Sequence, residues 1–322
     1  MLQDLSRGVP PTFAREISRV PFNSPDRCAE HPALGVIRFR RLGPIDGPPS
    51  VVLGGISADR RIDQWWSGVV GQGGPLDPDH HQLIAIDWLE SGRGSATFAS
   101  TEDQADAIAW VLDQLGITRP ATLVGASYGA MVGLAFAARH GELLKRLIAI
   151  SGAHRSTAHA SALRLLQRRI IRDYADRGQA DEGVAVARAI ALTGYRPAEL
   201  FERRFHAGQP ARVLEQLESY FQFNGARFTR RFDAHRYLAL SESIDHHRVD
   251  PRAIRCPVEA ISVDSDTLVP PAQMKAMVAA IGCHARLHCL GSRFGHDAFL
   301  KSIPALNRLL RPLVNPSAGE AT

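Results

Sequence analysis

Short apolar segments bounded by turn residues recur along the chain and alternate with longer, helix-length stretches. A strand that is covered on both faces of a sheet is apolar at nearly every position, so these segments predict buried strands. They lie at residues 51–55, 83–87, 121–125, 147–151 and 258–264. The stretches 103–115 and 130–140 have the length and composition of helices. Strands that alternate with helices predict an α/β fold, with a mostly parallel sheet and helices on both of its faces.

One long segment, residues 153–250, interrupts this alternation. It is rich in Arg, Leu and other residues that favour helices, and it contains no run that predicts a buried strand. Strand-like sequence resumes at Pro257, shortly after Asp250-Pro251. We therefore expect a core formed by residues 1–152 and 251–322, with the segment between them inserted as a helical lid.

A serine between two glycines follows the apolar segment 121–125. The sequence Gly125-Ala126-Ser127-Tyr128-Gly129 fits the pattern G-x-S-x-G, and a helix-like stretch begins directly after it. A serine in this context sits on a sharp strand-to-helix turn, where larger flanking side chains would collide with the sheet and the helix. The context predicts that Ser127 is the nucleophile of an α/β-hydrolase fold. The alternative is a glycine-rich turn with an incidental serine.

Two backbone N–H groups are expected to bind the oxyanion that forms when such a serine attacks. One belongs to Tyr128, directly after the serine. The other comes from the loop after an early strand, here Leu53-Gly54-Gly55, where either Leu53 or Gly54 donates and Leu53 is our assignment. The glycines of this loop would serve equally in a tight turn.

An acid and then a histidine should follow the serine along the chain, each just beyond a strand. His296 follows a glycine at the head of the last predicted helix, where a general base would take the proton from Ser127. The acid that orients the imidazole is Asp266 or, two residues earlier, Asp264, and Asp266 is our assignment. A histidine in a loop is otherwise an ordinary surface residue.

Composition and charge narrow the class of protein. The net charge of +5 comes almost wholly from arginines interleaved with acids, which does not favour nucleic-acid binding. Arginines of the inserted segment, Arg230 and Arg231 among them, either attract a phosphorylated substrate or lie on solvated helix faces. No run of 18 or more consecutive apolar residues occurs, so we expect no membrane span and no signal peptide. Four cysteines without CxxC spacing indicate reduced thiols and a cytoplasmic location.

The histidines predict no metal site. His80-His81 and His246-His247 are adjacent pairs that cannot converge as neighbouring ligands, and neither HExxH nor a clustered Cys/His spacing occurs. We therefore expect these four histidines on the surface, and no metal or bound cofactor.

Several further segments resemble the homoserine O-acyltransferases, enzymes of methionine biosynthesis built on the α/β-hydrolase fold, and the resemblance spans most of the chain. They are Trp65-Trp66 with residues 69–77, residues 88–95, Thr193-Gly194-Tyr195-Arg196, residues 201–205, Arg231-Phe232-Asp233-Ala234, residues 265–270 and residues 295–300. The resemblance implies a catalytic triad of Ser127, Asp266 and His296. It also implies that Arg196 and Asp297 bind the carboxylate and the ammonium of the amino-acid substrate.

The implied reaction transfers an acetyl or succinyl group from acyl-CoA to the hydroxyl of homoserine through an acyl-serine intermediate. Acyl-CoA and homoserine are then the small-molecule partners, and the family implies a homodimer packed through its lids. Two departures bear on substrate preference. The loop at residues 51–57 lacks the His and Thr usual near the family's oxyanion loop, and Tyr128 stands where a methionine often follows the nucleophile. The alternatives are a serine O-acyltransferase of the same family, an esterase or thioesterase, and a non-catalytic protein that retains the fold.

Overall fold

The computed structural model describes residues 25–94, 97–119, 121–206, 208–282 and 284–315. The strands are β1 (Asp26–His31), β2 (Gly35–Leu42), β3 (Pro49–Leu53), β4 (Gln82–Ile86), β5 (Ala121–Ala126), β6 (Leu144–Ile150), β7 (Val258–Val263) and β8 (Ala285–Leu290). They form one eight-stranded sheet in the order β1-β2-β4-β3-β5-β6-β7-β8. The pairs β1–β2 and β2–β4 are antiparallel and the others parallel, which confirms the predicted mostly parallel sheet.

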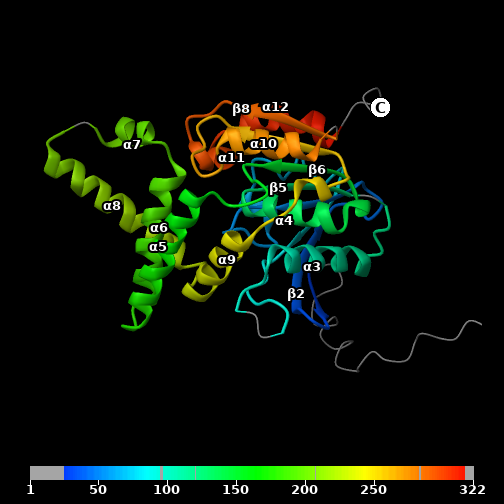
Figure 1. The fold of residues 1–322 in the computed structure, drawn as a ribbon, viewed down its shortest axis with the longest axis horizontal. Helices are drawn as coiled ribbons and strands as arrows, with labels where there is room; N and C mark the ends of the chain where they lie inside the picture. Colours follow the sequence, from blue (N-terminus) through cyan, green and yellow to red (C-terminus); the bar gives the residue numbers. More distant parts are fainter. Residues whose placement is uncertain (1–24, 95–96, 120, 207, 283, 316–322) are drawn as a thin grey trace, which may run out of the picture.

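Helices cover both faces of the sheet (Figure 1). The core helices are α2 (Ile62–Trp65), α3 (Thr101–Gln114), α4 (Tyr128–Arg139), α10 (Pro271–Ile281), α11 (Ala298–Lys301) and α12 (Ile303–Val314). In β6, Leu147 and Ala149 pack with α3, α4 and α10, whereas Ile148 and Ile150 pack with α2, α11 and α12. Alternate side chains of one strand thus enter two separate cores, which explains why the parallel strands are apolar throughout.

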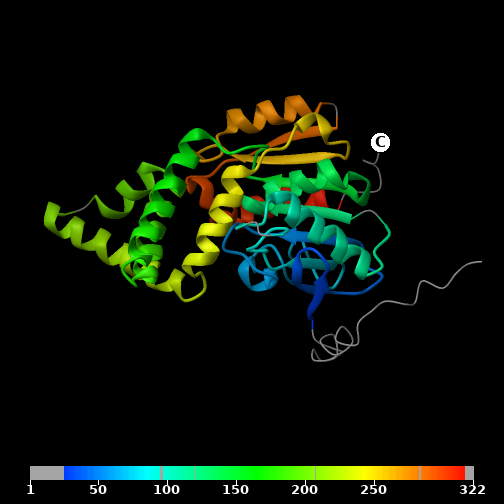
Figure 2. The same ribbon diagram turned by 60° about the horizontal axis from the view of Figure 1, so that its bottom comes forward.

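Between β6 and β7 the described elements are helices, and an isolated bridge there joins Arg155 to Arg248. The helices are α5 (Ala158–Ala175), α6 (Ala180–Tyr195), α7 (Ala198–Phe205), α8 (Pro210–Thr229) and α9 (Ala234–His246). Helix α6 packs against α5, α8 and α9. Figures 1 and 2 show these helices projecting from one side of the core, with α9 nearest to it and α7 and α8 farther out. We call α5 to α9 the helical insertion.

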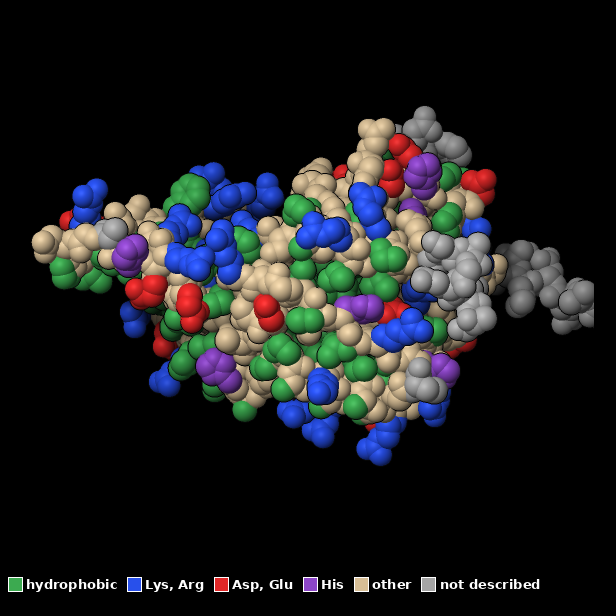
Figure 3. Space-filling model, turned by 90° about the horizontal axis from the view of Figure 1, so that it is seen from above, with side chains coloured by type: hydrophobic (Ala, Val, Ile, Leu, Met, Phe, Trp, Pro, Cys, Tyr) green, Lys and Arg blue, Asp and Glu red, His purple; other side chains and the backbone are tan. Residues whose placement is uncertain are grey.

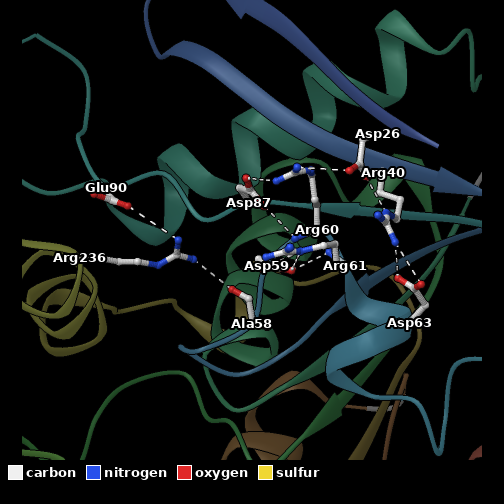
Figure 4. Close-up of polar contacts among 10 residues, drawn as sticks. All are labelled: Asp26, Arg40, Ala58, Asp59, Arg60, Arg61, Asp63, Asp87, Glu90 and Arg236. Carbon is white, nitrogen blue, oxygen red and sulfur yellow. Dashed lines mark hydrogen bonds and ion pairs between the residues drawn. The ribbon is translucent and has the colours of Figure 1, made fainter. Parts of the chain in front are cut away.

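A network of ion pairs holds the segment that follows the glycine loop after β3 (Figure 4). Arg60 contacts Asp87 at 2.8 Å and Asp26 at 3.3 Å, so this segment is joined to the strands at the antiparallel edge of the sheet. Arg236 of α9 donates to the carbonyl oxygen of Ala58 at 3.2 Å. The helical insertion and the sheet edge therefore both fix the chain just beyond the loop.

Two of the four histidines expected on the surface are buried, so that prediction was wrong for them. The side chains of His81 and His247 are 4% and 2% exposed. His247 follows α9, and its Nδ1 lies 2.8 Å from the hydroxyl of Thr101 at the start of α3. Burial lowers the pKa of His247 to about 3, so this imidazole is neutral and acts as a hydrogen-bonding link between the insertion and the core.

The described part of the chain contains three of the four cysteines. Cys28, Cys256 and Cys289 carry free thiols there, and Cys283 lies outside the described residues. Within the same residues, no group of His, Cys, Asp and Glu side chains has an arrangement suited to a metal ion. None of the described helices has the length and apolar character needed to cross a bilayer.

Candidate active site

Ser127 occupies the turn between β5 and α4 in a strained backbone conformation, with φ of 54° and ψ of −115°. The flanking glycines permit this turn. A Cβ atom added at Gly125 would lie 2.3 Å from the carbonyl oxygen of Gly129, and one added at Gly129 would lie 2.5 Å from the carbonyl oxygen of Leu53. Because neither glycine has a side chain, the helix can approach the sheet closely. The Gly129 N–H donates to the carbonyl of Gly54 at 3.0 Å.

The structure brings the hydroxyl, the imidazole and the carboxylate predicted from the sequence into one hydrogen-bonded line. The Oγ of Ser127 lies 2.7 Å from Nε2 of His296, and Nδ1 of His296 lies 2.7 Å from Oδ2 of Asp266. All three come from the ends of parallel strands or the turns beyond them, which places them at one edge of the sheet. This arrangement can activate a serine as a nucleophile.

The geometry distinguishes between the two acids proposed from the sequence. The other carboxylate oxygen of Asp266, Oδ1, accepts the backbone N–H groups of Leu268 and Val269 at 2.9 and 3.0 Å, which fixes its orientation toward the imidazole. Asp264 is exposed and accepts the N–H of Ser292 instead. The structure therefore places Asp266, and not Asp264, against His296.

His296 is held by its own turn. The preceding Gly295 has φ of 57°, and a Cβ there would lie 2.5 Å from the carbonyl oxygen of Tyr195 in the insertion. Burial acts most strongly on the pKa of His296 and lowers it, but the charge and hydrogen bond of Asp266 and the charge of Asp297 outweigh it. The pKa of His296 is consequently raised above its ordinary value of 6.5. The imidazole is thus a stronger base than a free histidine.

The two sites proposed for oxyanion donors both adjoin the nucleophile. Tyr128 is the first residue of α4, so its N–H has no partner within the helix. Leu53 ends β3 opposite Gly125 of β5, and the chain then passes Gly55, where an added Cβ would lie 3.8 Å from the Cβ of Ser127. The loop after β3 is therefore in position to supply the second donor, and its assignment to Leu53 stays a prediction.

The side chain of Tyr128 has a structural role that the sequence did not reveal. It is fully buried, its ring meets the ring of Trp88 edge-on at 4.8 Å, and its hydroxyl lies 2.8 Å from that of Ser243 in α9. Burial raises the pKa of Tyr128, so the phenol stays neutral. It joins the helix that begins at the nucleophile to the helical insertion.

Arg196 and Asp297 contact each other. The Nε of Arg196 donates to Oδ2 of Asp297 at 2.8 Å, and the same guanidinium also donates to the hydroxyl of Tyr220. The family resemblance assigns each residue to a different group of the substrate, and in this structure the two charges neutralise one another. Asp297 directly follows His296, so this ion pair lies beside the triad.

Comparison with known proteins identifies the family. The α/β hydrolase fold family matches residues 51–302. Homoserine O-succinyltransferase of Xanthomonas campestris pv. campestris is 41% identical over 285 residues, covering 85% of this chain and 77% of that protein. The chain belongs to the homoserine O-acyltransferase family of α/β hydrolases.

One further relative and one solved structure are similar to this homoserine O-acyltransferase family member. Serine O-succinyltransferase of Xanthomonas campestris pv. campestris (strain B100) is 32% identical over 302 residues, covering 76% of this chain and 80% of that protein. A crystal structure of homoserine O-acetyltransferase from Bacillus anthracis has a TM-score of 0.79 at 15% identity, covering 90% of this chain and 96% of that one. This second similarity shows the shared fold.

A cavity opens over Ser127 and His296 in this homoserine O-acyltransferase family member, with most of its wall supplied by the helical insertion. The ring of Tyr195 lies in that wall, 5.6 Å from the ring of His296. Arg155, Arg164 and Arg188 also line the cavity, and none of the described lining residues is Asp or Glu. The sequence did not distinguish these arginines from those on solvated helix faces, because the packing of the insertion decides which way each one points.

Proposed function

We propose that this protein transfers an acyl group from acyl-CoA to the hydroxyl of homoserine, with Ser127 as the nucleophile. The observation that carries the proposal is the hydrogen-bonded line from Ser127 through His296 to Asp266, in a chain of the homoserine O-acyltransferase family. The product, an O-acylhomoserine, suits the role in methionine biosynthesis that the family resemblance implies.

In the first half-reaction, Oγ of Ser127 attacks the thioester carbonyl carbon while its proton passes to Nε2 of His296. The N–H of Tyr128 and an N–H of the loop after β3 stabilise the resulting oxyanion. The tetrahedral intermediate then collapses with cleavage of the C–S bond, and the imidazolium gives its proton to the departing sulfur. CoA leaves as a thiol, and the acyl group remains as an ester on Ser127.

In the second half-reaction, the homoserine hydroxyl gives its proton to Nε2 of His296 and attacks the ester carbonyl. Collapse of the second intermediate breaks the bond to Oγ, and the proton returns to Ser127. The departing thiol and the entering hydroxyl both exchange a proton with the same nitrogen, so both reach the acyl carbon from the same side. Water would compete as a nucleophile, and the helical insertion over the site limits its access.

Homoserine binding is proposed at the Arg196–Asp297 pair. A zwitterion can insert between the two charges, with its carboxylate on Arg196 and its ammonium on Asp297, so that one ion pair is exchanged for two. The pair is mostly buried, with side-chain exposures of 16% and 10%, and it adjoins the proton-accepting imidazole. Both features favour a role in positioning the acceptor hydroxyl.

The phosphates of CoA are proposed to bind at a second cavity, which Arg196 lines. Arg204 and Lys301 contribute further positive charge there, and neither has an acidic partner among the described residues. Apart from Leu200, the other lining residues are aromatic, and they are Phe201, Phe205, Tyr220 and Phe294. Figure 3 shows basic side chains gathered over the projecting helices and where these meet the core. Cations beside aromatic surfaces suit a phosphorylated nucleotide.

A homodimer that packs through the helical insertion is part of the same proposal. Leu165 and Leu166 of α5 and Leu214 and Phe223 of α8 are large apolar side chains exposed on helices that project from the core. Burial of such side chains against a second copy would stabilise a dimer. We also propose a cytoplasmic location, where free thiols such as that of Cys28 stay reduced.

The test is a matrix of acetyl-CoA and succinyl-CoA against homoserine and serine, with products identified by mass spectrometry. We expect thiol release beyond the first turnover to depend on homoserine, together with formation of O-acylhomoserine. Serine differs from homoserine by one methylene, which a pocket discriminates by only about 1–3 kcal/mol, so serine is the natural competitor. Thiol release that is indifferent to either amino acid would instead indicate a thioesterase.

A further inference from the structure

We propose that the cavity over Ser127 accepts an acyl group that ends in a carboxylate, as a succinyl group does, and that Arg188 binds this carboxylate. The inference rests on the acyl transfer proposed above and extends it to the identity of the acyl group. Neither the motifs of the triad nor the Arg196–Asp297 pair involves Arg188, which lies in the middle of α6.

The charges around the cavity are unbalanced. Of its three arginines, Arg164 is paired with Asp245 at 2.6 Å, and that carboxylate also accepts from Arg168 at 2.6 Å. Arg155 is exposed. Arg188 is half-buried in the wall and has no acidic partner among the described residues. A guanidinium in this position lacks a counter-ion that a ligand carboxylate would supply.

Aromatic rings hold Arg188 in place. Its guanidinium carbon lies 4.7 Å from the centre of the Phe228 ring and 5.6 Å from that of the Tyr195 ring, and both rings line the cavity. Contact with ring faces leaves the edge of a guanidinium, which carries its N–H donors, available for a carboxylate. The guanidinium of Arg188 is therefore held in position with its N–H groups free to donate, unlike that of a mobile surface arginine.

One aromatic ring, that of Tyr195, lies next to both Arg188 and His296. Its centre is 5.6 Å from the centre of the His296 ring and 5.6 Å from the guanidinium carbon of Arg188, so these two groups are at most about 11 Å apart. With C–C bonds of about 1.5 Å, the end carbons of an extended succinyl group lie about 4 Å apart. A charge-assisted hydrogen bond to a guanidinium spans about 3 Å more. Ser127 and Arg188 line the same cavity, so a succinyl ester on Ser127 would carry its carboxylate toward Arg188. An acetyl ester ends at its methyl group and leaves Arg188 without a partner.

The carboxylate that binds Arg188 could belong to the acyl group or to homoserine. The first half-reaction distinguishes the two, because it takes place without homoserine. The experiment measures CoA thiol release in a single turnover without homoserine, using succinyl-CoA and acetyl-CoA in parallel. The variants are R188Q, which removes the charge, and R188K, which keeps the charge but lacks the paired N–H donors of a guanidinium. The control is R169Q, the same change at an exposed arginine of α5 that does not line the cavity.

We expect the unmodified protein to be acylated faster by succinyl-CoA than by acetyl-CoA. R188Q should reduce this preference at least about tenfold, the effect of a lost hydrogen bond between charged groups, and R188K should reduce it less. R169Q should keep the preference of the unmodified protein. Thermal unfolding of each variant, together with acylation by acetyl-CoA, reports whether the fold is intact.

Three results would overturn the proposal. The first is faster acylation of the unmodified protein by acetyl-CoA than by succinyl-CoA. The second is a fall in acylation rate in R188Q and R188K that is equally large with both donors. The third is a change in these variants that is confined to the KM for homoserine in the complete reaction. A different result would show that the proposed function is wrong. The protein would be acylated selectively by succinyl-CoA, but homoserine would not remove the acyl group from Ser127. In that case the assignment of Arg188 would stand and the acceptor would be wrong.

Discussion

Arg196 and Asp297 form an ion pair 2.8 Å long that joins the end of α6 to the turn carrying His296. Its carboxylate belongs to the residue next to the imidazole, and its charge is one of the influences that raise the pKa of His296. The pair thus connects two properties of the site, the proposed binding of the amino-acid acceptor and the basicity of the imidazole that is proposed to deprotonate it.

A pH profile tests this connection. His296 must be neutral to accept a proton, so the acylation rate should fall as the pH drops through a midpoint above 6.5. Asn at position 297 removes a negative charge that favours the imidazolium, so D297N should move that midpoint to lower pH. The measurement is thiol release without homoserine as a function of pH. D264N, at an exposed acid bonded elsewhere, should leave the midpoint in place, and an unchanged or higher midpoint in D297N would contradict the account.

Alanine at Gly129 tests the close approach of helix and sheet behind the nucleophile. The added Cβ would lie 2.5 Å from the carbonyl oxygen of Leu53, so β3 and its glycine loop must move away from the turn. We expect G129A to lose about 1–3 kcal/mol of unfolding free energy and most of its acylation rate. Gly141 has no neighbouring atom within 4 Å of an added Cβ, so G141A is the matched control. Full activity in G129A would show that the turn tolerates a side chain.

The sequence predicted the nucleophile, the base and the acid because each is marked by a local pattern. Ser127 lies between glycines after an apolar strand, and His296 and Asp266 follow later strands in the order that this fold requires. Local pattern could not predict which arginine of α5 or α6 faces the cavity, since that depends on how the helices of the insertion pack. The β1–β2 hairpin was missed for a related reason, because its strands are partly exposed and lack a continuous apolar run.

Buried His247 predicts how stability depends on pH. Its pKa is lowered from 6.5 to about 3 in the folded protein, so below pH 6.5 the unfolded chain binds a proton that the folded protein does not. Stability from this group is therefore present above pH 6.5 and is lost as the pH falls, by about 2 kcal/mol at pH 5. Urea unfolding at pH 7.5 and pH 5 should show this loss in the unmodified protein and a smaller one in H247Q. H80Q, the same change at an exposed histidine, should lose as much stability between these two pH values as the unmodified protein does.

The second cavity predicts a selective effect on donor binding. R204Q and K301Q should each raise the KM for acyl-CoA about two- to fivefold, the range expected for exposed charge pairs, with little change in the rate at saturating donor. Higher salt should reduce the difference from the unmodified protein. R203Q, at an exposed arginine of α7 outside this cavity, provides the comparison. An equal increase in R203Q would show that general surface charge, and not this cavity, attracts the donor.

The central claim is that the acyl group passes through Ser127, and mass spectrometry of the protein during turnover tests it most directly. The protein is mixed with acyl-CoA without an acceptor, digested, and examined for the added acyl mass on the peptide that contains Ser127. We predict an acyl ester at this serine that homoserine discharges as O-acylhomoserine, no adduct in S127A, and a loss of activity in S127A of about 10⁴-fold or more. Homoserine acylation by S127A at the rate of the unmodified protein would contradict the account.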